Sequence, residues 1–238
     1  MVRESTHLGR KATTAIKQSF RTAAAINRPL NTYVTINVMQ TEAPEEETSA
    51  RFLKLRERRF GRWASYIPKS TRRPRNGPPT DVWVIEAPNG HAHIHWVLHI
   101  DPVHQEEFEK KLVRWVDAEF KIGTWAEHAV DIRPVQANTA STLGAYLAKG
   151  TDPNLAAFYY IPDRFLSPQG VVCGKRSGVS LNLATTARTR LKNEGAIRRH
   201  KYQPQQKFPQ HRVSSRYVTQ EISGPNAGTA DTVAQQLR

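Results

Sequence analysis

The stretch that decides the fold is Gly90–Ile100, GHAHIHWVLHI. Its residues alternate, with His91, His93, His95 and His99 separated by mostly large apolar side chains. Successive side chains of a β-strand point to opposite faces of the sheet. The pattern therefore predicts a strand that buries one face in a core and presents four of the chain's nine histidines on the other face.

The preceding segment supplies a carboxylate close to these histidines. Asp81–Ala87 (DVWVIEA) is rich in β-branched and aromatic residues, which favours a second strand. It is followed by Pro88–Gly90, a turn sequence with proline and glycine in suitable places, so we expect the two strands to be hairpin neighbours. Glu86 then faces the start of the histidine strand, seven positions before His93 and nine before His95.

Glu86, His93 and His95 form a donor set that suits a divalent metal ion. Two imidazoles and a carboxylate leave coordination positions open to water or substrate, as in metal sites that carry out chemistry. A closed structural zinc site usually has four protein ligands, often thiolates, and Cys173 is the one cysteine of the chain. His91 lies on the same predicted face, and we keep it as an alternative to Glu86 as third ligand.

Tyr146 is a candidate nucleophile on a predicted helix. Residues 138–150 (NTASTLGAYLAKG) form a helical pattern, with Asn138 or Thr139 as the cap and a glycine at the end. Residues three apart share a helical face, so Tyr146 and Lys149 project together. A nearby ammonium favours the phenolate form of a phenol, whose pKa is otherwise near 10. The structural alternative is a packed tyrosine, with a lysine that is favourable near the helix C-terminus.

Three motifs together resemble one enzyme family. Thr32–Val38 (TYVTINV) resembles the short threonine-containing strand of HUH endonucleases, and His93-Ile94-His95 resembles their His-hydrophobic-His motif. Tyr146-Leu147-Ala148-Lys149 resembles the motif of their nucleophile, a tyrosine followed three residues later by a lysine. The resemblance covers about residues 31–150 and continues more weakly through Val172–Leu183.

This resemblance implies a single-tyrosine replication initiator that nicks and rejoins single-stranded DNA at a specific site by metal-assisted transesterification. Tyr146 would attack phosphorus and form a 5′-phosphotyrosine, and Lys149 would place the phosphate or lower the pKa of the phenol. Glu86, His93 and His95 would hold Mg²⁺ or Mn²⁺. The free 3′-OH would prime rolling-circle replication of a plasmid or phage.

The resemblance also implies partners. They are single-stranded or hairpin origin DNA and, because the sequence lacks the phosphate-binding loop of a nucleotide-driven motor, a host helicase and polymerase in trans. A single-tyrosine enzyme needs a second protomer, or reversal at the same tyrosine, to end a round, so a dimer is compatible with this function. A relaxase or transposase of the same family would share the chemistry, although relaxases more often use a third histidine where this chain has Glu86.

The distribution of charge agrees with a DNA partner. The chain has a net charge of +14, yet residues 77–172 hold seven basic and twelve acidic residues. Residues 51–76 hold ten basic residues and one acid, and residues 173–216 hold eleven and one. A catalytic segment between two cationic segments suits an active site flanked by surfaces that grip phosphates. The candidate DNA-binding residues are Arg58, Arg59, Arg72, Arg73, Lys175 and Arg176.

Length and composition set the expected organisation. We expect a basic N-terminal extension over residues 1–30, a catalytic domain over 31–185, and a basic C-terminal extension over 186–238 with a disordered tail. The absence of an apolar leader, of a membrane-length apolar stretch and of paired cysteines predicts a cytoplasmic protein with no membrane partner.

The order of predicted elements indicates an α+β fold. Strands near 32–39, 81–87, 91–101 and 127–135 alternate with helices near 46–66 and 104–121, followed by the Tyr146 helix. This β-α-β-β-α-β order predicts a ferredoxin-like or RRM-like central antiparallel sheet with helices on one face. The HUH resemblance would place the histidines on its central strand and the tyrosine on a helix across the open face. Two other classes stay open, a cupin-type metal enzyme and a nucleic-acid-binding protein without catalysis.

Overall fold

The computed structural model describes residues 3–67, 75–124, 126 and 128–197. The helices are α1 (Arg10–Ala25), α2 (Thr48–Lys54), α3 (Arg62–Ser65), α4 (Gln105–Phe120), α5 (Ala140–Leu147), α6 (Pro153–Ala156) and α7 (Thr185–Asn193). The strands are β1 (Glu4–Ser5), β2 (Thr32–Asn37), β3 (Asp81–Glu86), β4 (His93–Leu98), β5 (Val130–Pro134), β6 (Val172–Cys173) and β7 (Ser177–Val179). A π-helical segment, Leu55–Gly61, joins α2 to α3.

The centre of the fold is a five-stranded sheet in the order β5-β2-β4-β3-β7, in which every neighbouring pair is antiparallel. In chain order, its strands β2, β3, β4 and β5 and the helices between them follow the predicted β-α-β-β-α-β order, which is compatible with the ferredoxin-like class. The hairpin prediction is confirmed, because β3 and β4 pair along their length and Glu86 lies opposite His93. An antiparallel sheet covered by helices is also not the all-β jelly roll of a cupin.

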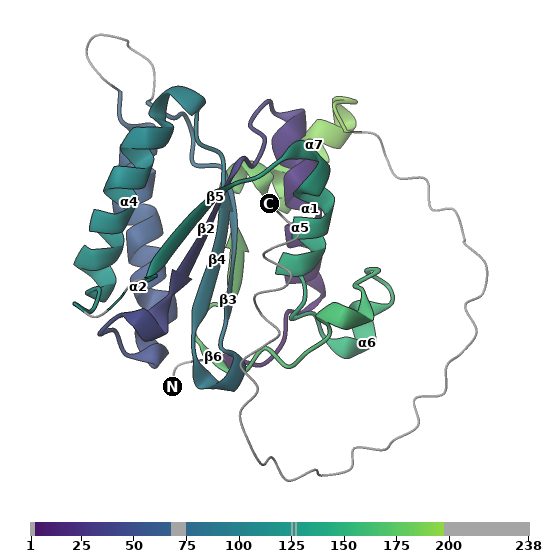
Figure 1. The fold of residues 1–238 in the computed structure, drawn as a ribbon. Coiled ribbons are helices and arrows are strands. Elements are labelled where there is room, and N and C mark those ends of the chain that lie inside the picture. The colour runs from purple at the N-terminus through teal and green to yellow at the C-terminus, as the bar shows by residue number, and fades with distance from the viewer. Residues whose placement is uncertain (1–2, 68–74, 125, 127, 198–238) are drawn as a thin grey trace, which may run out of the picture. The chain divides into compact units, whose positions relative to one another are not determined.

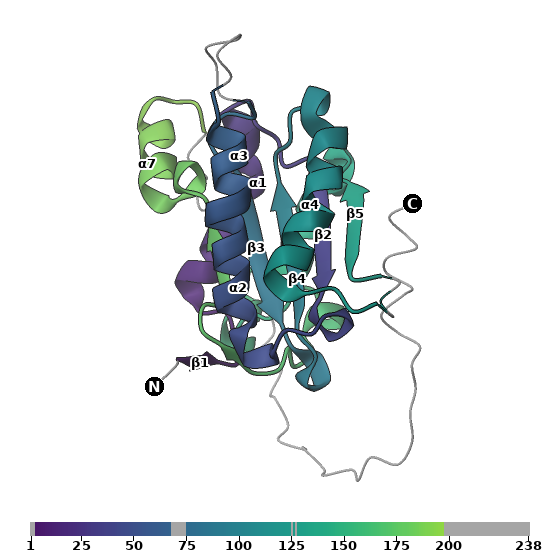
Figure 2. The same ribbon diagram turned by 90° about the vertical axis from the view of Figure 1, so that its left-hand side faces the viewer.

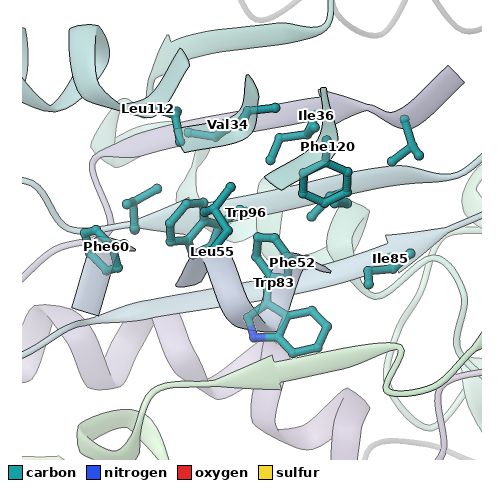
Figure 3. Packing of buried hydrophobic residues seen from close by; sticks show 14 of the residues in the cluster. Val34, Ile36, Phe52, Leu55, Phe60, Trp83, Ile85, Trp96, Leu112 and Phe120 are labelled. Carbon is teal, nitrogen blue, oxygen red and sulfur yellow. The ribbon is translucent and has the colours of Figure 1, made fainter. Parts of the chain in front are cut away.

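One face of the sheet packs against α2, α3 and α4 (Figure 2). Trp83 of β3 and Trp96 of β4 are buried there against Phe52 and Phe60, with ring centroids 5.1–5.4 Å apart (Figure 3). Aromatic side chains in such edge-to-face contacts bury a large apolar area, so this cluster is the main core. Phe52 and Phe60 are fully buried in this core and so are not available to stack on bases.

The opposite face is covered by α1 and α5 (Figure 1). The prediction of helices on one face only is therefore wrong, and so is the treatment of residues 1–30 as an extension. The buried residues of helix α1 are mainly small or hydroxylated, and Ile16 is the one large apolar residue among them, while Phe20 is partly buried against the same cluster. The hydroxyl groups are satisfied within the fold, as where Thr13 Oγ1 lies 3.0 Å from Thr151 Oγ1. One compact unit spans residues 1–198 and so includes α1 and α7.

Asp81, at the start of β3, is a buried carboxylate that connects three elements. Its two oxygens accept hydrogen bonds from Arg56 Nε at 2.6 Å and Arg56 Nη2 at 2.9 Å. Oδ2 also accepts from Trp96 Nε1 at 2.9 Å, and the backbone N–H of Asp81 donates to Ser180 Oγ. A fully buried carboxylate is tolerated because these donors replace water.

The predicted C-terminal tail falls on residues 198–238, which lie outside the described residues. Among the helices of the described ranges, none has both the length and the apolar character needed to cross a bilayer.

Candidate active site

The candidate site lies between the sheet and α5, on the face opposite the aromatic core. Alternation along β4 sends Ile94, Trp96 and Leu98 into that core, so His93 and His95 point to the α5 side. On β3 the same alternation puts Glu86 beside them. Glu86 has 1% of its surface exposed and His95 has 6%, so both groups interact almost entirely with other protein atoms.

Lys149 and His95 both contact the same oxygen of Glu86. The Lys149 ammonium lies 2.7 Å from Glu86 Oε2, and His95 Nε2 lies 3.1 Å from it. Burial alone would raise the pKa of Glu86, but the neighbouring His95 and Lys149 lower it below its ordinary value. Burial alone would lower the pKa of Lys149, but the charge of Glu86 and contacts with Tyr146 raise it. At neutral pH the site therefore holds a carboxylate and an ammonium.

His95 is oriented by a second tyrosine. The hydroxyl of Tyr33 on β2 lies 2.6 Å from His95 Nδ1, and the two rings stack with centroids 5.9 Å apart. Burial, with Tyr146 nearby, raises the pKa of Tyr33 well above its ordinary value, so this hydroxyl keeps its proton. We assign His95 the tautomer in which Nδ1 accepts from Tyr33 and Nε2 donates to Glu86.

Tyr146 stands next to this group. Its ring lies edge-to-face with His95 at 5.4 Å between centroids, and Lys149 Nζ lies 4.0 Å from the centre of the same ring. Phe165 contacts the Tyr146 ring as well, with centroids 5.9 Å apart. Tyr146 reaches His95 and Lys149 reaches Glu86 because the two residues are three apart, with Tyr146 in the last turn of α5 and Lys149 just past its end. The structure thus brings the side chains of Tyr146 and Lys149 into contact, as their spacing predicts.

His93 and Asn37 form the outer part of the site. They lie directly opposite each other on β4 and β2, and Glu86 is opposite His93 on the other side. Burial lowers the pKa of His93 to about 4, so its imidazole is neutral at pH 7. Within the described residues, the buried oxygens Asn37 Oδ1 and Glu86 Oε1 have no hydrogen-bond partner. Buried polar atoms normally have partners, so two orphan oxygens beside a neutral imidazole fit a cation.

The donor set fits a divalent ion, although the ligands are not preassembled. In the described part of the chain, no three His, Cys, Asp or Glu side chains are grouped closely enough to hold a metal. The nearest set is Glu86, His93 and His95, in which Lys149 and the Nε2 proton of His95 now neutralise Glu86 Oε2. Metal ligation requires an unprotonated nitrogen, so binding would displace that proton and turn Tyr33 into the acceptor of an Nδ1–H.

The two remaining histidines of the predicted strand lie apart from this set. His99 Nδ1 is 2.8 Å from the carbonyl oxygen of Pro29, which gives it a structural partner. His91 precedes β4 and is exposed.

The candidate DNA-binding residues differ in their availability. Arg58 and Lys175 are exposed. Arg59 Nε donates to Glu119 Oε1 at 2.9 Å, so its charge is partly neutralised. Arg176 is a correction, because it has 5% of its surface exposed and its guanidinium donates to the carbonyl oxygens of Thr6, Gln169 and Gly170. It holds the chain together and cannot reach DNA. Arg72 and Arg73 lie outside the described residues.

Two residues of the site, Tyr33 and Asn37, were missed by the sequence analysis. The sequence did contain a signal, because in Thr32–Asn37 the apolar Val34 and Ile36 alternate with Tyr33, Thr35 and Asn37, which puts those three on one face of a strand. What the sequence did not reveal is that this face adjoins the histidines of β4.

A comparison of the chain with protein-family models finds no match, and a comparison with curated proteins finds no relative.

Proposed function

We propose that this protein is a single-tyrosine HUH-type endonuclease that nicks and rejoins single-stranded DNA to start rolling-circle replication. The observation that carries the proposal is the contact of Tyr146 and Lys149 with His95 and Glu86. Sequence motifs far apart in the chain suggested these four residues as one site, and they meet on one face of the sheet.

The proposed reaction is a transesterification. Tyr146 Oη attacks the scissile phosphorus, a phosphotyrosine bond forms, the bond to the 3′ oxygen breaks, and the phenol proton passes in net terms to that oxygen. A phenol is a weak nucleophile at neutral pH, so it needs electrostatic help. The Lys149 ammonium supplies it, because a raised pKa keeps the charge in place 4.0 Å from the centre of the ring.

Glu86, His93 and His95 would hold Mg²⁺ or Mn²⁺, with Asn37 beside them as a further oxygen donor. When bound, such an ion stabilises the negative charge that develops on the phosphate. The neutral imidazole of His93 suits this role, since a protonated histidine cannot bind a metal. Tyr33 would act through His95, by fixing the orientation and tautomer of its ring.

The segregated charge supports a polyanionic substrate. Arg58 and Lys175 are exposed on the basic segments that flank the acidic centre of the sequence. Exposed cations bind the phosphates of any sequence, so recognition of a specific origin requires further contacts.

A second candidate from a different class is a single-stranded nucleic-acid binder that does not cut. The observation that favours it is the Glu86–Lys149 ion pair, which neutralises the carboxylate without a metal. A relaxase or transposase would share the reaction and differ in its DNA partner.

The test is covalent capture. The protein is incubated with a labelled pool of random-sequence single-stranded hairpins and Mn²⁺ or Mg²⁺, then denatured. We expect a labelled protein band and, after digestion, the nucleotide on the peptide that contains Tyr146. Tyr146→Phe should give no band, whereas Tyr66→Phe, at an exposed tyrosine on the far side of the sheet, should give as much as wild type. Binding without any adduct would favour the second candidate.

A further inference from the structure

The chain makes an excursion from the candidate site between Lys149 and Phe165. It leaves at the end of α5, forms the short helix α6, and returns where Phe165 contacts the Tyr146 ring at 5.9 Å. Figure 1 shows α6 on the outside of the molecule, past the end of α5. Both ends of this segment, Lys149 and Phe165, therefore contact Tyr146, the proposed nucleophile.

Tyr159 anchors the middle of this segment to α1. Its hydroxyl lies 2.7 Å from Thr14 Oγ1 and donates to the carbonyl oxygen of Arg10 at 3.0 Å. Lys17 Nζ donates to the carbonyl oxygen of Tyr159. With Tyr159 held on both its side chain and its backbone, the residues on either side of it are displayed in a fixed way.

Both neighbours of Tyr159 are aromatic and exposed. Phe158 has 61% of its surface exposed and Tyr160 has 65%, among the highest values for large hydrophobic residues in the described part of the chain. The fold gains little from rings left in water.

The backbone at Tyr160 is unfavourable for a tyrosine. Its φ is +52°, in the left-handed region, and it follows the helical turn in the position that glycine favours. The hydrogen bonds are those of a helix C-cap, from Ile161 N to Ala156 O and from Tyr160 N to Ala157 O, both at 3.1 Å. A residue that strains the backbone and exposes its ring is better explained by a function of the ring than by folding.

One cation lies over the Phe158 ring, and another lies over Phe165 at the end of the segment. The Arg10 guanidinium lies over the Phe158 ring at 5.7 Å, and that of Arg164 lies over Phe165 at 5.0 Å. Both arginines are exposed. Two acids share the segment, of which Asp152 caps the N–H of Asn154, while Asp163 is exposed beside Arg164.

We propose that Phe158 and Tyr160 form a stacking platform for the bases of single-stranded DNA entering or leaving the Tyr146 site, with Arg10 and Arg164 holding the adjacent phosphates. This proposal rests on the proposed function, and it adds the surface along which the single-stranded DNA lies. Exposed aromatics stack on bases of any sequence, and positive charge beside them follows the backbone. A duplex hides the faces of its bases, so the platform selects single strands.

The test uses the full chain and a fluorescent single strand of about 16 nucleotides, without a divalent ion. We expect Tyr160→Gly to weaken binding at least about fivefold, because a stacking ring is lost. The same change should raise Tm by about 3 °C, because glycine relieves the backbone. Phe158→Ala should weaken binding similarly. Tyr160→Phe keeps the ring and should bind DNA like wild type. Leu181→Ala, at an apolar residue with 89% exposure, is the matched control and should bind like wild type.

The outcomes separate this proposal from the preceding one. If wild type forms the Tyr146 adduct while Tyr160→Gly and Phe158→Ala bind DNA normally, the platform is refuted and the nuclease stands. If these variants lose binding but wild type forms no adduct, the platform stands and the nuclease is refuted. A shift in oligomeric state of the DNA-free variants would assign the surface to a second copy and overturn the platform, as would a wild type that does not bind single strands.

Discussion

Replacing Lys149 with methionine removes the ammonium from a buried ion pair and leaves Glu86 with His95 alone. Glu86 has 1% of its surface exposed and the Lys149 side chain has 15%, so water cannot take the place of the lost charge. Removing one partner of such a pair generally costs about 3–5 kcal/mol. Methionine keeps most of the packing volume, so the effect reports on charge.

The cost has a ceiling because Glu86 can take up a proton instead. Keeping a carboxyl with an ordinary pKa of 4.5 neutral at pH 7 costs 2.5 pH units at 1.36 kcal/mol each, or about 3.4 kcal/mol. In the variant the folded-state pKa of Glu86 lies above the unfolded value, so stability is lost as pH rises. In wild type that pKa is lowered, so this group has no effect between pH 5 and 7. We therefore expect a loss of about 3 kcal/mol at pH 7 that shrinks by about 1.4 kcal/mol for each unit towards pH 5.

Urea denaturation of wild type and Lys149→Met at pH 7.0, 6.0 and 5.0 measures this difference. The double variant Glu86→Gln/Lys149→Met should be more stable than Lys149→Met at pH 7, since it leaves no charge unpaired. Mn²⁺ should stabilise Lys149→Met more than wild type, because the ion no longer competes with the ammonium for Glu86. A difference that does not change with pH, or a double variant less stable than the single one, would refute the reasoning.

Four further changes test other contacts. Tyr33→Phe should slow adduct formation about tenfold and leave DNA binding intact, because His95 loses its 2.6 Å partner; an unchanged single-turnover rate would contradict this. Arg176→Ala should lower the free energy of unfolding by about 3 kcal/mol, because buried carbonyls lose their donor, without changing the salt dependence of DNA binding. Arg58→Ala should leave the free energy of unfolding unchanged and reduce the salt slope of DNA binding by about one unit. Burial alone would raise the pKa of Glu119, but two cationic neighbours lower it, so its contribution is present above the unfolded pKa and lost as pH falls through the folded one. The difference in stability between wild type and Glu119→Gln should therefore be constant from about pH 7 to 5 and shrink as pH falls below the unfolded pKa, and a difference growing in acid would show the sign to be wrong.

The strands could be predicted because their two faces differ in chemistry. In β2 and β4 one face enters the aromatic core, so the alternation is visible in the sequence. Helix α1 could not be recognised in this way, since its buried face includes Thr13, Ser19 and Thr22. Thr13 is buried there with a partner that only the fold supplies, since its Oγ1 lies 3.0 Å from Thr151 Oγ1. Hydrophobic periodicity carries no such information.

The candidate site was predictable as far as its residues share a strand, a hairpin or a helical turn. Glu86 with His93, and Tyr146 with Lys149, are pairs of this kind. Tyr33 became a neighbour of His95 through strand order, which depends on pairing between distant segments. Arg176 shows the same limit, because a loop arginine that binds its own chain's carbonyls looks like any other cation in the sequence.

The carboxylate at the start of β3 has a consequence for the one at its end. Asp81 and Glu86 are five residues apart, an odd number, so they point to opposite faces of the sheet. A slip of β3 by one residue would exchange the faces and carry Glu86 away from His95. The fork of Arg56 and the indole of Trp96 hold Asp81 in a single register. The contacts of Asp81 on the far side of the sheet thus fix the register of β3, and with it the direction of the Glu86 side chain, without touching Glu86.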